Sequence, residues 1–281
     1  MEPAAIARKL SGDGRIVEVG TGVGRLYRVW DGTDTSLVKI YSSVSAERRE
    51  RQALDNLAGL PGLPIVVRRG VEDEIPWVVF EEPGKWNLSS LPESISLGRK
   101  AGEVLAALHS HDTGHLSNVE HGMDAEWING DYPSTFKRLE RYRGRLHLPA
   151  EVVARAMELT PPTTGAPVII HTDPNPEQVM VDDDGNVTLF HWEWSTLGPP
   201  EWDYSRLLWL TRLKAGPDSA AGVMEGYGTE ISEDQLERWA VYHSGMMLKQ
   251  AVEAPDQQLR GADSVSYTHL RAHETALNIS Y

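Results

Sequence analysis

The 281-residue sequence contains no cysteine, which excludes disulfides, thiolate metal sites and thiol catalysis. No apolar run reaches the length of a membrane span. Residues 1–10 carry mixed charge without the apolar core of a signal peptide, so a cytoplasmic protein without a membrane partner is expected. Neither Gly-x-Ser-x-Gly nor His-Glu-x-x-His occurs, so two common hydrolase signatures are missing.

The chain also has fewer basic residues than acidic ones. Its 27 Lys and Arg residues face 41 Asp and Glu residues, which gives a formal net charge of −14. A nucleic-acid partner is not expected, because nucleic acids select a basic footprint. An acidic cleft would concentrate a cationic small molecule, although an acidic surface can equally serve solubility alone.

The most informative stretch runs from Val168 to Asp203. A short apolar strand leads into the polar loop 171–178, and Asp-Gly and Gly-Asn steps within 179–190 mark a tight hairpin. The hairpin should bring the loop beside a second polar cluster at 191–194. Four side chains are expected to surround one point: Asp173, Gln178, His191 and Glu193.

This pattern resembles the catalytic segment of the kinase superfamily, where His-x-Asp, four residues, an amide residue and a hairpin precede a metal-binding Asp. It is more similar to the aminoglycoside phosphotransferase and choline kinase-like branch. That branch usually reads His-Gly-Asp-x-x-x-x-Asn and then Ile-Asp-Trp-Glu. The corresponding residues here are His171-Thr172-Asp173 with Gln178, and Phe190-His191-Trp192-Glu193.

The resemblance implies an α+β, two-lobed protein kinase-like fold. An N-terminal antiparallel sheet lobe (1–84) would bind the nucleotide, and a mainly helical C-terminal lobe (85–263) would hold the catalytic loop and substrate. ATP is the implied cofactor, with GTP not excluded. The implied reaction is phosphoryl transfer to a hydroxyl of an aminoglycoside-like small molecule, with Asp173 orienting the hydroxyl or accepting its proton.

Glycines stand between two expected strands near the N-terminus. Gly20, Gly22 and Gly24 lie between strands 15–19 and 25–30. This differs from a Rossmann fingerprint, where the glycines open a helix. It fits the kinase loop that covers nucleotide phosphates, although a plain glycine-rich hairpin would give the same pattern.

Lys39 lies on the next expected strand, where the resemblance places the ATP-binding Lys. A half-buried Lys needs a partner. Glu50, on a helix expected over 46–57, is the first choice and Glu47 the alternative, unless these residues simply face solvent. Glu82 marks the approximate hinge, where backbone groups would bind adenine.

Two expected metal-binding positions depart from the family pattern. Gln178 replaces Asn and is one methylene longer, while His191 replaces Asp and removes a carboxylate. Magnesium prefers hard oxygen ligands, and imidazole suits transition metals better. The metal is therefore expected to be Mg²⁺ or Mn²⁺, held by Gln178 and His191. Two interpretations stay open: an active small-molecule kinase with an altered metal site, or a degenerate kinase-fold protein that binds nucleotide with little turnover.

Further helices are expected over 97–109, 136–146, 150–159, 204–213 and 235–252, with residues 111–135 irregular. Asp203 should cap the helix at 204 and tie down the catalytic loop. His109 is interpreted as a helix cap or a packed residue. The nearby His111, His115 and His121 match no standard metal spacing.

Residues 264–281 are interpreted as non-native. Val265 to Thr275 matches the translation of a common transposase-based sequencing adapter, and Ile279 to Tyr281 fits its continuation. The segment is therefore left out of the fold prediction.

Overall fold

The computed structural model describes residues 2–21, 24–111, 119 and 122–253. Gly22, the histidines at 115 and 121, and the segment 264–281 lie outside the described residues. The chain divides into two compact units, residues 1–122 with 166–230 and residues 123–165 with 231–281. The lobe boundary at residue 84 stays a prediction.

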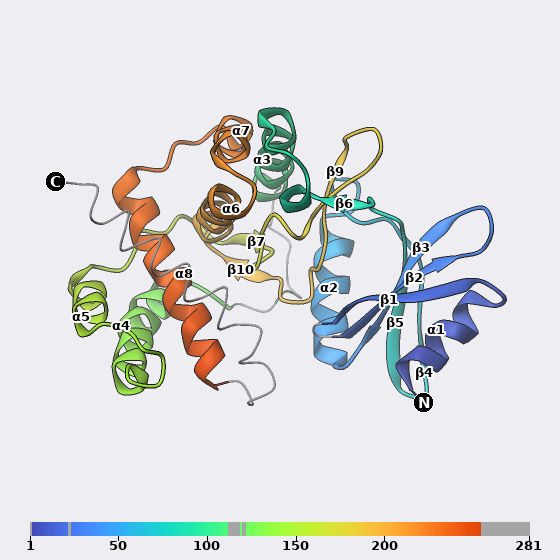
Figure 1. Cartoon of the computed structure of the whole chain (residues 1–281), viewed down its shortest axis with the longest axis horizontal. Coiled ribbons are helices and arrows are strands. Elements are labelled where there is room, and N and C mark those ends of the chain that lie inside the picture. The colour runs from blue at the N-terminus through green and yellow to red at the C-terminus, as the bar shows by residue number, and fades with distance from the viewer. Residues whose placement is uncertain (1, 22–23, 112–118, 120–121, 254–281) are drawn as a thin grey trace. The chain divides into compact units, whose positions relative to one another are not determined.

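The α-helices of the described chain are labelled in Figure 1. They are α1 (Pro3–Ser11), α2 (Val44–Asn56), α3 (Ile95–His109), α4 (Ala125–Tyr142), α5 (Ala150–Glu158), α6 (Pro200–Lys214), α7 (Pro217–Tyr227) and α8 (Glu233–Glu253). The strands are β1 (Arg15–Thr21), β2 (Gly24–Trp30), β3 (Thr35–Tyr41), β4 (Val66–Glu72), β5 (Ile75–Glu81), β6 (Trp86–Asn87), β7 (Val168–Ile170), β8 (Val179–Val181), β9 (Val187–Leu189) and β10 (Thr196–Gly198).

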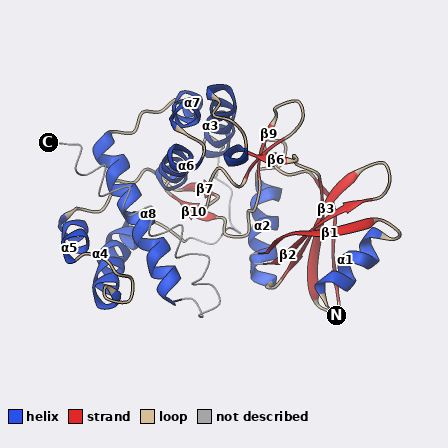
Figure 2. Ribbon diagram, in the orientation of Figure 1, coloured by secondary structure: helices blue, strands red, loops and turns tan. Residues whose placement is uncertain are grey.

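The first unit opens with an antiparallel sheet in the order β1-β2-β3-β5-β4, drawn in red in Figure 2. The first three strands form the predicted meander. The Asp31 carboxylate closes the β2–β3 turn by accepting hydrogen bonds from the backbone N–H groups of Thr33 and Asp34, each at 2.9 Å. Lys39 therefore lies on a strand flanked by β2 and β5.

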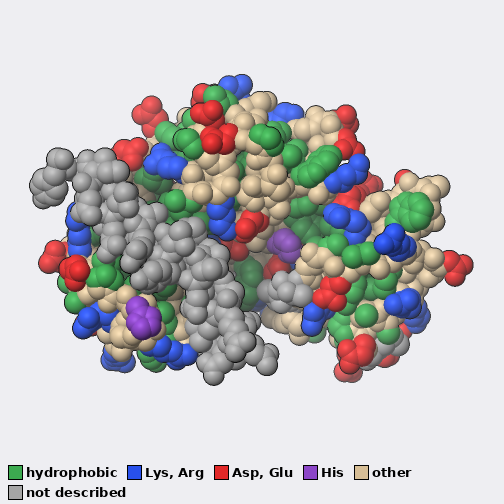
Figure 3. Space-filling view, viewed as in Figure 1, with side chains coloured by type: hydrophobic (Ala, Val, Ile, Leu, Met, Phe, Trp, Pro, Cys, Tyr) green, Lys and Arg blue, Asp and Glu red, His purple; other side chains and the backbone are tan. Residues whose placement is uncertain are grey.

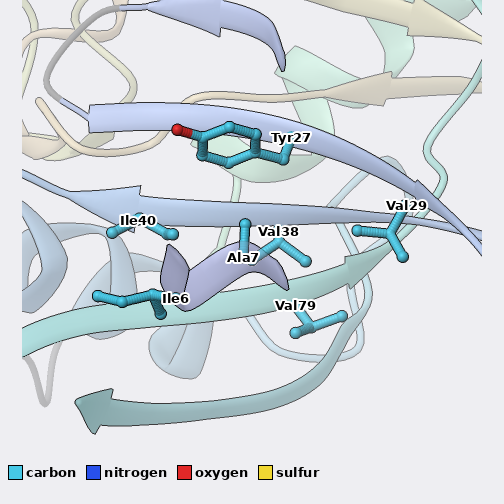
Figure 4. Packing of buried hydrophobic residues seen from close by; sticks show 7 residues of the cluster. All are labelled: Ile6, Ala7, Tyr27, Val29, Val38, Ile40 and Val79. Carbon is cyan, nitrogen blue, oxygen red and sulfur yellow. The ribbon is translucent and has the colours of Figure 1, made fainter. Parts of the chain in front are cut away.

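Different helices cover the two faces of this sheet. Successive strand residues point to opposite faces, so Val38 and Ile40 face one side while Lys39 and Tyr41 face the other. Helix α2 lies on the Lys39 face, and α1 packs on the opposite face. The core beneath α1 is shown in Figure 4 and contains Ile6, Ala7, Tyr27, Val29, Val38, Ile40 and Val79.

Short strands support the segment from Val168 to Gly198. Strands β8 and β9 form the predicted hairpin, and Asp182 closes its turn by accepting hydrogen bonds from the backbone of Asp184 at 3.0 Å and Asn186 at 2.7 Å. Strand β6 extends this hairpin, while β10 pairs antiparallel with β7. The polar loop after β7 and the cluster after β9 therefore have a fixed support.

Helices α3 and α7 approach each other through glycines. A Cβ atom added at Gly102 on α3 would lie 2.3 Å from the Val223 carbonyl oxygen, and one at Gly226 on α7 would lie 1.9 Å from the Arg99 carbonyl oxygen. Gly98 and Gly222 make the same kind of contact one turn earlier. The absence of side chains lets the two backbones touch. Helix α7 was not predicted from the sequence.

The second unit contains α4, α5 and α8. The prediction that residues 111–135 are irregular is wrong for its last part, because α4 begins at Ala125. Ile128, Tyr132 and Phe136 recur at helical spacing and are buried, so tertiary packing outweighs the unfavourable Pro133. The Tyr132 hydroxyl donates to the Ala156 carbonyl at 3.0 Å and ties α4 to α5.

Acidic and basic side chains are interspersed on the face drawn in Figure 3 rather than gathered into a field of one sign. Among the described residues, no helix combines the length and the apolar character needed to cross a bilayer.

Candidate functional site

Lys39 is almost completely buried, with 2% of its surface exposed. Its Nζ donates hydrogen bonds to both carboxylate oxygens of Glu50, at 3.0 and 2.8 Å, and to Glu193 Oε2 at 2.5 Å. Burial lowers the pKa of Lys39, but the two carboxylates outweigh it and the pKa is raised above its usual value. Lys39 is therefore a buried, permanently charged group.

Glu50 is held from several sides. The Tyr41 hydroxyl donates to its Oε2, and the backbone N–H of Trp192 donates to its Oε1 at 3.0 Å. The predicted Lys39–Glu50 contact is thus present, and it joins β3, α2 and the segment after β9. The alternative partner, Glu47, instead accepts a hydrogen bond from Arg51 at 3.0 Å.

Glu193 is the second buried carboxylate beside Lys39. Burial raises its pKa, but Lys39 and His191 outweigh burial and hold the pKa well below its ordinary value. His191 Nδ1 lies 3.4 Å from Glu193 Oε1. The Glu193 backbone carbonyl accepts a hydrogen bond from Arg49 Nε at 2.8 Å, which anchors the segment to α2.

Asp173 receives donors on both carboxylate oxygens. Arg206, on α6, donates to Oδ1 through Nε at 2.8 Å and through a second guanidinium nitrogen, and Gln178 Nε2 donates to Oδ2 at 3.1 Å. Burial raises the pKa of Asp173, but Arg206 outweighs it and the pKa falls below its usual value. The carboxylate is therefore ionised and fixed in orientation.

Asp203 holds the loop in front of Asp173. Its fully buried carboxylate accepts hydrogen bonds from the backbone N–H groups of His171 at 2.6 Å and Thr172 at 2.9 Å. The prediction that Asp203 ties down the loop is confirmed. The prediction that it caps a helix is wrong, because α6 begins at Pro200 and has Pro199 at its N-cap.

Thr172 and His191 have φ values of 74° and 73°, in the left-handed region that disfavours β-branched and bulky residues. Thr172 Oγ1 donates to the Trp194 carbonyl at 3.1 Å. His171 is buried; its Nε2 donates to the Phe190 carbonyl at 2.8 Å, and its Nδ1 has no hydrogen-bond partner among the described residues. These contacts lock the loop against the segment after β9.

The glycine run is described at two of its three predicted positions. Gly20 lies in β1 and Gly24 opens β2. A Cβ atom at Gly24 would lie 2.2 Å from the Ile40 carbonyl oxygen, so glycine is required there by the close approach of β3. Glu82 follows β5 and accepts hydrogen bonds from Arg28 at 2.7 and 3.1 Å. Roles for Gly20, Gly22, Gly24 and Glu82 in nucleotide binding remain predictions.

A model of the phosphotransferase enzyme family matches residues 16–242, which is most of the chain. The chain belongs to this family. A search of curated proteins found no match.

Solved structures of phosphotransferases resemble the chain in fold. A GDP complex of an aminoglycoside 2′-phosphotransferase-IIIa mutant has a TM-score of 0.73 at 14% identity and covers 99% of this chain and 97% of that chain. The macrolide 2′-phosphotransferase of Brachybacterium faecium has a TM-score of 0.67 at 14% identity, covering 92% and 96%. A spectinomycin phosphotransferase with ADP and spectinomycin has a TM-score of 0.63 at 13% identity, covering 92% and 88%. The predicted α+β kinase-like fold is confirmed.

The sequence resemblance predicts Gln178 and His191 as the metal-binding residues. Gln178 Oε1 is buried without a hydrogen-bond partner in the described chain, which suits a ligand oxygen. The nearby Glu193 carboxylate, however, is bound to Lys39, and the described residues hold no group of three His, Cys, Asp or Glu placed for a metal. The side chains of Gln178, His191 and the Lys39-bound Glu193 therefore do not provide the set of oxygen ligands that Mg²⁺ requires. Metal binding by Gln178 and His191 remains a prediction.

Two features of the site were missed from the sequence. One is Arg206, which lies three residues after Asp203 on α6; this helical spacing puts both residues on the face that meets the loop and is the signal that could have found it. The other is the Lys39–Glu193 contact, which joins residues far apart in sequence and has no local pattern.

Proposed function

We propose that this protein transfers the γ-phosphoryl group of ATP or GTP to a hydroxyl group of a small molecule. The observation that carries the proposal is the buried ion pair between Glu50 on α2 and Lys39, which lies on the sheet that also carries the glycine run. The fixed, ionised Asp173 on the loop after β7 supports it. In kinases these elements hold the nucleotide phosphates and orient the acceptor hydroxyl.

The proposed chemistry is an in-line displacement. The acceptor oxygen forms a bond to the γ-phosphorus while the bond to the β–γ bridging oxygen breaks, which leaves a nucleoside diphosphate. Asp173 accepts the hydrogen bond of the attacking hydroxyl and takes its proton as the bond forms. Its lowered pKa makes it a weak base, so its main contribution is orientation.

The proposed substrate is a polyhydroxylated small molecule, aminoglycoside-like and cationic. Structural relatives are named for aminoglycosides, spectinomycin and a macrolide, which supports a small acceptor. The net charge of −14 favours a cation and argues against nucleic acid. The proposal includes a cytoplasmic location.

A second candidate is a degenerate kinase-fold protein that binds nucleotide with little turnover. The observation that favours it is the pair of departures at Gln178 and His191, where the donors do not fit Mg²⁺. Replacing His191 by Asp separates the two candidates. A large gain in Mg²⁺-dependent transfer would support the degenerate site, and a loss would support a working role for His191.

The proposal is tested by binding and by transfer. Purified protein should be stabilised by ATP or GTP in thermal unfolding, with Mg²⁺, Mn²⁺ or chelator present, and Lys39→Met should remove the shift. Lys85→Met is the matched control, because Lys85 is exposed and forms a surface ion pair with Asp183 at 2.6 Å. Asp173→Asn should abolish transfer of labelled γ-phosphate to amino sugars, macrolides and amino alcohols. No nucleotide effect under any condition would overturn the proposal.

A further inference from the structure

The donors of Lys39 are fully occupied within the protein. An ammonium group has three N–H donors. Here they point to Glu50 Oε1, Glu50 Oε2 and Glu193 Oε2, at 3.0, 2.8 and 2.5 Å. A nucleotide phosphate that binds Lys39 must therefore replace one of these three oxygens.

The charge around Lys39 also opposes an anionic ligand. Two buried carboxylates face one ammonium group, so the cluster of Lys39, Glu50 and Glu193 carries a net charge of −1. Interactions between charges are strong at such buried positions, because little water screens them. The cluster would repel phosphate until one carboxylate leaves.

Glu193 is the carboxylate that can leave. Glu50 is held by the Tyr41 hydroxyl and by the Trp192 backbone N–H in addition to Lys39. The Glu193 carboxylate is held by Lys39 Nζ at 2.5 Å and, over a longer distance, by His191, whose Nδ1 lies 3.4 Å from Oε1. Its backbone is anchored separately by Arg49, so the side chain can move without moving the segment.

We infer that Glu193 is an internal competitor of the nucleotide phosphates for Lys39 and thereby sets the nucleotide affinity of this protein. The inference rests on the proposed function, since it assumes that Lys39 meets a nucleoside triphosphate. The triphosphate displaces the Glu193 carboxylate and takes over the third donor of Lys39. Glu50 stays bound throughout and holds the ammonium group in place.

The test is a direct binding measurement. Dissociation constants for ATP and GTP are measured by titration calorimetry, in EDTA and in Mg²⁺, for the wild type, Glu193→Gln and Glu193→Asp. Gln keeps the shape and removes the charge, while Asp keeps the charge but is one methylene shorter. Glu72→Gln is the matched control, because it removes a carboxylate from another Lys–Glu pair, at 2.5 Å from Lys9 Nζ.

The expected result is tighter binding by about tenfold for Glu193→Gln, equal to about 1.4 kcal/mol, with a smaller gain for Glu193→Asp and none for Glu72→Gln. Unchanged or weaker binding by folded Glu193 variants, with a wild type that binds, overturns the inference alone. The shorter Asp variant keeps the test decisive if Glu193→Gln does not fold. Absence of binding by every protein overturns the inference together with the proposed function.

Discussion

The buried side chain of His171 makes the stability of the folded protein depend on pH. Burial lowers the pKa of His171 below its usual value of 6.5, and protonation would place a proton on Nδ1, which has no partner among the described residues. The unfolded chain therefore binds a proton at higher pH than the folded chain. The stability contributed by neutral His171 is fully present above about pH 6.5 and is lost as the pH falls toward the lowered pKa.

We expect His171→Gln to reduce the loss of unfolding free energy between pH 7.5 and pH 5.5, measured with urea. Gln keeps an N–H donor for the Phe190 carbonyl but does not titrate. Replacing the exposed His147 by Gln is the control and should leave the pH dependence as in the wild type. An unchanged slope in His171→Gln would contradict the prediction.

Contacts between residues of the family motifs could be predicted from the sequence. Contacts that depend on how distant elements pack together could not. The Lys39–Glu50 pair and the role of Asp203 in holding the loop follow from motif positions. Arg206 reaches Asp173 from another element, and Glu193 reaches Lys39 from a distant one. Helical spacing from Asp203 could have placed Arg206 near the loop, but the Lys39–Glu193 pair leaves no periodic trace in the sequence, because either partner could also face solvent.

At the scale of elements, α7 is a helix that the periodicity of apolar residues in the sequence does not reveal. It is rich in Ser, Ala and Gly, and its helical state is stabilised by close contact with α3 rather than by an apolar stripe. The start of α4 was missed for a related reason, since Gly130 and Pro133 are poor helix formers and only the buried Ile128 and Tyr132 reveal the helix. Strands with alternating residues, such as β2 and β3, were predicted well.

The close α3–α7 contact predicts how Gly→Ala substitutions in these helices affect stability. Gly102→Ala and Gly226→Ala should each destabilise the protein by about 1–3 kcal/mol, because the new methyl group meets backbone at 2.3 and 1.9 Å and the helices must separate. Gly130→Ala is the matched control on α4. It meets nothing within 4 Å and should stabilise by about 0.5–1 kcal/mol, since Ala favours the helix. Urea unfolding measures all three, and equal effects at the three sites would contradict this packing.

At the scale of the whole molecule, the net negative charge affects stability. The net charge is −14, and residues 264–281 contain one Arg and one Glu, so the value is the same with or without the segment interpreted as non-native. Like charges repel one another in the compact state. Exposed ion pairs such as Lys9–Glu72 oppose this only weakly, at about 0–1 kcal/mol each.

Added salt should therefore stabilise the folded protein. Raising NaCl from 10 to 150 mM shortens the screening length from about 30 to about 8 Å, which removes most repulsion between distant carboxylates. A gain of about 1 kcal/mol would raise Tm by about 2–4 °C. Tetramethylammonium chloride, which has no hydroxyl group, should give the same rise if screening is the cause, whereas a rise with NaCl alone would indicate binding of Na⁺. A Tm that falls in both salts would mean that ion pairs outweigh the net repulsion in this fold.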